Sequence, residues 1–153
     1  MNRKAKNDRK VAQSIIFMSQ HLDEPVKITQ LAKMANLSSS YFWALFKQKT
    51  GYAPIDFFIR LRMHQACYLL NSTNRKVKDI AAALGYKDPL YFSRLFKSVH
   101  GVAPNHYRVT VHGAVDRAFH RDGHPLVSGG IGVSQHAVEE AVLRPEFALA
   151  LIA

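Results

Sequence analysis

Apolar residues recur every three or four positions between residues 8 and 22, which is the spacing of one face of an α-helix. Pro25 interrupts this pattern, because proline lacks an amide donor and disfavours helix in the residue before it. The sequence therefore predicts a helix over residues 8–22 and a break over residues 23–27. The inward face of this helix is expected to carry Val11, Ile15, Met18 and Leu22.

A phrase of helix length occurs twice further along the chain. "YFWALFKQKTGYAP" begins at Tyr41 and "YFSRLFKSVHGVAP" begins at Tyr91, and the two share Tyr, Phe, Leu, Phe, Lys, Gly, Ala and Pro at the same spacing. A short predicted helix and a turn of three or four residues precede each copy. The offset between copies is 49 residues through the short helix and 50 through the long one, so the second turn is one residue longer. This order of elements is the anatomy of a helix-turn-helix unit.

Capping residues mark the ends of these predicted helices. The first short helix is expected to open near Thr29 and to end at Asn36, which tolerates a left-handed backbone, and Gly85 holds the equivalent position in the second copy. The longer helices are expected to begin after the capping residues Ser38 and Asp88. Their inward stripes and terminal glycines are Phe42, Leu45, Phe46 and Gly51 in the first copy and Phe92, Leu95, Phe96 and Gly101 in the second.

Residues 54–72, "PIDFFIRLRMHQACYLLNS", have the pattern of one long helix between the two copies, and a last short helix is expected over about 104–108. The sequence therefore predicts an all-α fold in which two homeodomain-like helix-turn-helix subdomains are joined by a long linker helix. We place the subdomains at residues 8–53 and 73–109, within a domain of residues 1–109. The apolar side of the linker helix is expected to carry Phe58, Leu61, Ala66 and Leu69.

Charge is distributed unevenly along the 153 residues. Residues 1–109 hold 18 Lys and Arg against 6 Asp and Glu, a net charge of +12, whereas residues 110–153 hold 3 against 5, a net charge of −2. A basic domain of this size is typical of a protein that binds a polyanion, since each neutralised phosphate releases counterions. Charge alone leaves open a soluble basic domain with no such partner.

Cysteine usage and hydropathy indicate the compartment. Cys67 is the one cysteine in the sequence, which excludes an intramolecular disulfide and a cysteine-based zinc site. Gln and Ser interrupt the apolar run near the N-terminus, unlike in a secretory signal, and no stretch approaches the roughly 18 to 20 apolar residues of a membrane span. We therefore expect a soluble, cytoplasmic protein without membrane association.

Residues 77–108, "VKDIAAALGYKDPLYFSRLFKSVHGVAPNHYR", resemble the signature of AraC/XylS-type transcription regulators. Residues 60–70, "RLRMHQACYLL", resemble the linker helix of the same family, and the whole resemblance covers about residues 8–109. The features that carry the signature are Ile80, Ala81, Gly85, Tyr86, the run Tyr91 to Arg94, Phe96, Lys97, Gly101, Pro104, Tyr107 and Arg108.

The resemblance implies a two-lobed DNA-binding domain of a bacterial, nucleoid-associated transcription regulator. Its two reading helices are expected to enter successive major grooves on one face of double-stranded DNA, about one helical turn or roughly 34 Å apart, so that a monomer reads both. An activator is implied rather than a repressor, with RNA polymerase as the protein partner. No cofactor is expected, and no small-molecule effector domain in this chain.

The base-reading positions of the family map onto the outward sides of the two predicted reading helices. Arg94 can bond guanine O6 and N7 together, although a phosphate contact or a solvated charge is the alternative. Trp43 is expected to pack on a thymine methyl, unless it folds over onto a neighbouring helix. Ala44 stands where many relatives carry a longer polar side chain, so we expect the second helix to supply more of the polar discrimination. The base-reading candidates are Ser40, Trp43, Ala44, Leu90, Ser93 and Arg94.

Four further positions are candidates for phosphate contacts, which position a protein without reading sequence. Lys47 and Lys97 are equivalent positions near the ends of the reading helices. Thr29 and Lys78 lie at the starts of the short helices, where backbone amides also meet phosphate. For each lysine, a solvated surface position is the alternative.

No catalytic or metal site is expected. His64 and Cys67 lie three residues apart, as a nucleophile and its base can, but Cys67 adjoins Tyr68 on a core helix, and a lone buried cysteine usually behaves as a small hydrophobe. The histidines of the C-terminal tail are irregularly spaced and have no cysteine beside them. They are His112, His120, His124 and His136.

Residues 110–153 match nothing in the family pattern and are expected to be a C-terminal extension of low order, with one short amphipathic helix over 135–143. The sequence leaves three origins open for this segment: an unrelated extension, the product of a reading-frame accident, or a partner-binding segment. Two other functions also remain open for the chain. The first alternative is a helical protein-interaction module whose basic face binds an acidic partner. The second is a fragment of a longer ligand-sensing regulator without independent DNA specificity.

Overall fold

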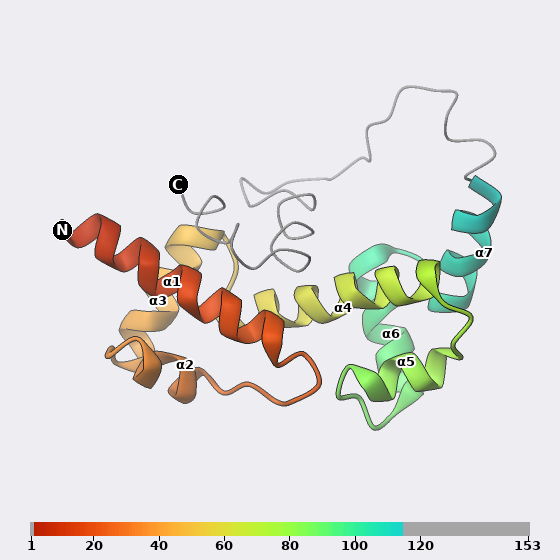
Figure 1. Cartoon of the computed structure of the whole chain (residues 1–153), viewed down its shortest axis with the longest axis horizontal. Coiled ribbons are helices and arrows are strands. Elements are labelled where there is room, and N and C mark those ends of the chain that lie inside the picture. Colours follow the sequence, from red (N-terminus) through yellow and green to blue (C-terminus); the bar gives the residue numbers. More distant parts are fainter. Residues whose placement is uncertain (1, 115–153) are drawn as a thin grey trace. The chain divides into compact units, whose positions relative to one another are not determined.

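The computed structural model of this chain describes residues 2–114, and side chains as far as Thr110. These residues form seven helices and no strand, so the all-α fold is confirmed. The predicted helix over 135–143 and the rest of residues 115–153 lie outside the described residues. The helices are α1 (Arg3–Gln20), α2 (Ile28–Met34), α3 (Ser39–Thr50), α4 (Pro54–Ser72), α5 (Val77–Ala83), α6 (Pro89–His100) and α7 (Pro104–Ala114) (Figure 1).

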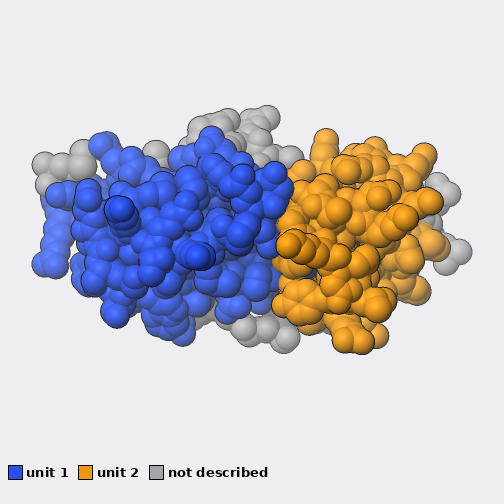
Figure 2. Space-filling view, turned by 90° about the horizontal axis from the view of Figure 1, so that it is seen from below, with its two compact units in different colours: residues 1–64, 130–153 blue, residues 65–129 orange. Residues whose placement is uncertain are grey.

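The described chain divides into two compact units, and the division falls between His64 and Gln65, inside α4 (Figure 2). The first unit holds α1, α2, α3 and the first part of α4, and the second holds the rest of α4 with α5, α6 and α7. The bounds of α4 agree with the long helix predicted over 54–72. None of the helices in residues 2–114 is long and apolar enough to cross a membrane.

In the first unit, α1 and α2 both pack against α3 (Figure 1). Phe42 and Phe46 of α3 are fully buried and Leu45 is nearly so, as the apolar stripe predicted. The ring of Phe46 meets that of Phe57 in α4 edge-on, with centroids 5.3 Å apart. Burying one phenyl ring stabilises a fold by about 1.5–3 kcal/mol. One side of α3 is therefore committed to the core.

The bounds of α1 differ from the predicted 8–22. The helix begins at Arg3, because the side chain of Asn2 caps it by accepting a hydrogen bond of 2.7 Å from an amide of the first turn. It ends at Gln20, and Leu22 lies beyond it, half-buried. The first turns consist mainly of basic and polar residues. These residues lack the apolar periodicity from which the helix was predicted, so the prediction began too late. The other predicted core residues of this helix are buried, namely Val11, Ile15 and Met18.

The two short helices end in the same backbone motif. Asn36 has a φ of 55° and Gly85 a φ of 83°, the left-handed conformation expected at both positions. In each copy the following amide donates a hydrogen bond back to a carbonyl of the helix, which is the Schellman arrangement. These bonds run from Leu37 to Ala32 and from Tyr86 to Ala81, both at 2.9 Å.

The caps of the long helices are as predicted, but the cap of the first short helix is not. Ser38 and Asp88 accept hydrogen bonds from amides in the first turns of α3 and α6. The expected capping role of Thr29 was wrong: α2 begins at Ile28, its N-cap Lys27 makes no side-chain cap, and Thr29 lies exposed within the first turn. Ile28 packs against the core, which draws the helix start ahead of the threonine.

In the second unit, α5 and α7 pack against α6. Phe92 and Phe96 are fully buried, but Leu95 is only half-buried, so the predicted stripe is narrower than in α3. The ring of Phe96 meets that of Tyr107 in α7 edge-on, with centroids 5.6 Å apart. α7 is longer than the predicted 104–108, because no proline or other helix-ending residue follows directly after this range.

One arginine in each unit ties a loop to the helices. Arg62 of α4 is buried, and its guanidinium donates to the carbonyls of Leu22 and Glu24 in the loop before α2, at 2.8 and 2.7 Å. Arg108 of α7 donates to the carbonyl of Arg75, in the loop before α5, at 2.6 Å. Carbonyls outside any helix thereby gain charged donors. The two arginines do not occupy equivalent positions of the repeat, so the sequence pattern did not indicate either role.

Replacing Arg62 with lysine keeps a positive charge but removes the planar set of donors. Because one ammonium group cannot reproduce both bonds in this geometry, we expect Arg62→Lys to lower the free energy of unfolding by about 1–3 kcal/mol. Urea unfolding of the full chain, followed by circular dichroism, measures this change. Arg9→Lys on the exposed side of α1 is the matched control, expected to alter stability by about 0.5 kcal/mol or less. Equal losses in both variants would contradict the role assigned to Arg62.

Candidate nucleic-acid interface

The buried stripes leave one face of α3 and one face of α6 toward solvent. Helical residues advance by about 100° each, so positions three, four and seven further along share a face. That face lies roughly opposite the buried phenylalanines. We call the two surfaces the α3 outward face and the α6 outward face. They consist of Ser40, Trp43, Ala44 and Lys47 in α3, and of Leu90, Ser93, Arg94 and Lys97 in α6.

All four side chains of the α3 outward face are exposed. Trp43 keeps 41% of its surface exposed, and the Nζ of Lys47 lies 5.0 Å from the centre of its ring. A cation in this position is attracted by the negative face of an indole, so each side chain restrains the other. Trp43 also lines an open hollow of about 340 Å³ together with Ile28, Ser39 and Ser40. The indole is therefore presented to solvent beside a cation and a concave surface.

The α6 outward face is more polar. Leu90, at the start of the helix, is 70% exposed, Arg94 and Lys97 are exposed, and Ser93 is half-buried. Arg94 offers a planar fork of donors at the position where α3 has Ala44, which has no polar side-chain atom. The expected division of labour between the two helices, like the contacts of these side chains to bases, stays a prediction.

Neither α3 nor α6 contains an acidic residue. The carboxylate of Asp8 in α1 is engaged by Lys49, whose Nζ lies 2.6 Å away. Asp88 precedes α6 and accepts a hydrogen bond of 2.9 Å from the amide of Leu90. The nearby acids are thus occupied by a salt bridge and a helix cap. Surfaces that carry cations without carboxylates favour a polyanionic partner.

The candidate phosphate contacts of the short helices are accessible. Thr29 in the first turn of α2 and Lys78 in the first turn of α5 are both exposed. The N-caps of these helices, Lys27 and Lys76, make no side-chain cap hydrogen bond. Their phosphate roles, like those of Lys47 and Lys97, stay predictions.

The N-terminal part of α1 reaches the start of α3, a contact that the sequence analysis missed. Hydrogen bonds from the side chains of Arg3 and Asn7 to Tyr41 lower the pKa of this tyrosine below its ordinary value of 10.0, and the charge of Lys10 acts in the same direction. The signal in the sequence was Asn2, since an asparagine ahead of several helix-forming residues is a helix-start pattern.

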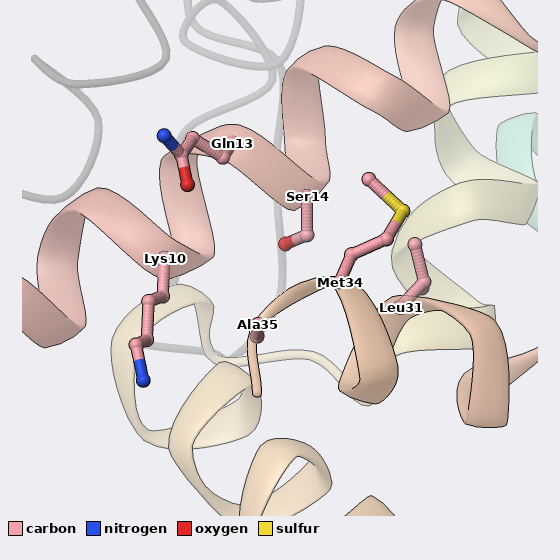
Figure 3. Close-up of a pocket in the computed structure, with 6 residues that line it drawn as sticks. All are labelled: Lys10, Gln13, Ser14, Leu31, Met34 and Ala35. Atoms are coloured by element: carbon pink, nitrogen blue, oxygen red, sulfur yellow. The ribbon is translucent and has the colours of Figure 1, made fainter. Parts of the chain in front are cut away.

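A second, much smaller hollow lies between α1 and α2. Its volume of about 30 Å³ leaves room for only a few water molecules. Figure 3 shows Ser14 of α1 and Met34 of α2 on opposite sides of it. A small-molecule effector does not fit in this space. Its lining residues are Lys10, Gln13, Ser14, Leu31, Met34 and Ala35, none of which belongs to an outward face.

Cys67 is buried, and its Sγ lies 3.4 Å from the Nε2 of His100 in α6. The ring of His100 packs against that of Phe96, with centroids 4.5 Å apart. The spacing of His64 and Cys67 along α4 did not indicate this contact. Among the residues that the structure describes, no three His, Cys, Asp or Glu side chains gather as a metal site requires. The side chains of the four tail histidines lie outside the described part.

A family model and solved structures of other proteins show which protein family this chain belongs to. Residues 31–110, more than half of the chain, match the family model described as a helix-turn-helix domain. The crystal structure of the DNA-binding domain of AdpA, a global transcriptional factor, in complex with a target DNA is similar, with a TM-score of 0.63 and 28% identity. The match covers 71% of this chain and 96% of that one. The chain belongs to the AraC/XylS helix-turn-helix family.

Curated relatives extend well beyond this AraC/XylS domain. The MmsAB operon regulatory protein of Pseudomonas aeruginosa is 40% identical over 95 residues, which make up 62% of this chain and 31% of that protein. The lactose operon transcription activator of Staphylococcus xylosus is 30% identical over 98 residues, or 64% of this chain and 35% of the activator. The chain therefore spans about a third of the length of the curated relatives it matches.

Removing the Arg3 donor tests the link between α1 and α3 in this AraC/XylS domain. We expect Arg3→Met to move the pKa of Tyr41 upward toward 10.0, because a hydrogen bond and a positive charge that favour the phenolate are both lost. The titration of ¹³C-labelled tyrosine rings by NMR measures this pKa. Arg9→Met removes the same charge elsewhere on α1 and is the control. An equal shift in both variants would mean that diffuse charge, and not the hydrogen bond, perturbs Tyr41.

Proposed function

We propose that this chain binds double-stranded DNA with sequence specificity and regulates transcription. The observation that carries the proposal is the pair of outward faces, which have the same spacing, contain no acidic residue and project from helices committed to a core on their other side. An α-helix fits the major groove of B-DNA, which is about 12 Å wide. The solved structure of the similar AdpA domain with a target DNA supports the same reading.

Under this proposal one chain reads two successive major-groove segments, the first with α3 and the second with α6. The base contacts come from the outward faces, namely Ser40, Trp43, Ala44, Leu90, Ser93 and Arg94. The phosphate contacts come from Thr29, Lys47, Lys78 and Lys97. The net charge of +12 over residues 1–109 supplies the part of the affinity that is independent of sequence and sensitive to salt.

The role we propose is binding rather than catalysis, and activation rather than repression. The similarity to a lactose operon transcription activator supports activation. RNA polymerase is the protein partner under this proposal. Cys67 is the one thiol of the sequence, and its burial deprives it of the access that a nucleophile needs.

Selection of duplexes from a random pool by the full chain tests the function. We expect two short enriched segments separated by about one helical turn, and binding at least about a thousandfold tighter than to unselected DNA at physiological salt. Enrichment of no sequence, with only weak binding that salt abolishes, would overturn the proposal and favour a protein-interaction module.

Arg94 and Lys97 separate base reading from phosphate contact on the same helix. Arg94→Ala is expected to weaken binding to the selected duplex by about 1–3 kcal/mol and to relax the preference at one base pair. Lys97→Ala is expected to weaken binding to all duplexes alike and to reduce the slope of log affinity against log salt by about one. Fluorescence anisotropy over a salt series measures both. If Arg94→Ala also weakens every duplex equally, Arg94 contacts phosphate instead.

A further inference from the structure

The hollow on the first unit combines an apolar wall with a polar rim. Trp43 and Ile28 supply apolar surface from α3 and α2, and Ser39 and Ser40 supply hydroxyl groups at the start of α3. Two of the four lining residues, Ser40 and Trp43, belong to the α3 outward face. The hollow thus opens where the proposed function brings the edges of the bases.

One base edge matches this composition. In the major groove, thymine alone among the four bases presents a methyl group, and it does so beside the O4 acceptor. An indole and an isoleucine side chain suit the methyl, and a serine hydroxyl can donate to O4. Guanine is instead read best by the two-pronged guanidinium of an arginine, and Ala44 leaves the α3 outward face without one, while the ammonium of Lys47 is engaged over the Trp43 ring.

Lys47 strengthens this assignment. Its Nζ lies 5.0 Å from the centre of the Trp43 ring, so the indole is restrained before any ligand arrives. The same cation stands beside the hollow, where a polyanion would bring its charge. An apolar surface held next to an exposed positive charge fits a duplex groove better than it fits an uncharged apolar ligand.

We propose that the hollow lined by Ile28, Ser39, Ser40 and Trp43 binds the methyl-bearing edge of thymine, and that Trp43 determines the base preference of α3. The inference rests on the proposed function and deepens it, because it names the base that the first unit recognises. α3 then reads sequence chiefly through an apolar contact, and α6 through hydrogen bonds.

Replacing single thymines by deoxyuridine in the selected duplex tests the proposal, since uracil differs from thymine only in lacking the methyl group. Base pairs whose preference changes in Arg94→Ala identify the segment read by α6, and the other segment belongs to α3. We expect one thymine in the α3 segment whose replacement weakens binding of the wild-type chain about three- to fivefold, the loss that one buried methyl group gives. In Trp43→Ala the same replacement should have no effect.

Two controls keep this result interpretable. Trp43→Phe retains an apolar ring without the indole N–H and should preserve the penalty for deoxyuridine. Thymines in the α6 segment should respond identically in the wild-type chain and in Trp43→Ala. Circular dichroism confirms folding, which the 41% exposure of Trp43 leads us to expect for both variants.

Several results would overturn the inference. They are an α3 segment without a methyl-sensitive thymine, a deoxyuridine penalty that persists unchanged in Trp43→Ala, or loss of the penalty in Trp43→Phe. Each of them leaves the proposed function standing, provided that the pool selection has returned a specific duplex. Failure of the selection itself would instead remove the function on which the inference rests.

Discussion

Phe42 and Phe46 in α3, and Phe92 and Phe96 in α6, are fully buried, and the other constraints on these two helices follow from that burial. Each ring contributes about 1.5–3 kcal/mol, whereas a whole domain is stable by only about 5–15 kcal/mol. Turning either helix to expose its pair would cost a large part of that stability. The orientation of the opposite side is therefore determined by the core, and the residues on that side are available for contacts that contribute nothing to folding. In the second unit Leu95 is less buried than Leu45 is in the first, so the two rings make up a larger part of the buried side of α6.

Left-handed turns and hydrogen bonds from arginines to loops fix the positions of the helices around these rings. The left-handed residues Asn36 and Gly85 stop each short helix and return an amide to it, so the chain leaves both helices in the same conformation. Arg62 and Arg108 then secure the loops that lead into α2 and α5. The buried guanidinium of Arg62 resists displacement, because moving it would leave a charge and polar groups without partners in a medium of low polarity. The positions of the outward faces within each unit thus depend on residues that are not themselves among the proposed base contacts.

Most helices and turns could be predicted from the sequence, because they depend on local sequence patterns and these patterns occur twice. The stripes, the caps Ser38 and Asp88 and the left-handed turns each depend on residues a few positions apart. The start of α1 was missed because basic helical turns carry no apolar period, and Thr29 was misassigned because packing of Ile28 outweighed the capping preference. The role of Arg62 joins residues 38 and 40 positions apart, which no local pattern reveals. The outward faces were named through a family resemblance, but the hollow beside Trp43 depends on the approach of α2 to α3 and could be found only in three dimensions.

The two outward faces differ in chemistry although α3 and α6 belong to the two copies of one sequence pattern. α3 presents an indole and a methyl group where α6 presents a hydroxyl and a guanidinium. A recognition element read by such a pair has no twofold axis, so reversing it end to end would bring each helix to the wrong half. Under the proposed function, the chain would therefore bind its DNA site in one orientation only, and a protein partner would be held on the same side of the site each time. A symmetric dimer of identical subunits on a palindromic site, by contrast, looks the same in both orientations along the DNA.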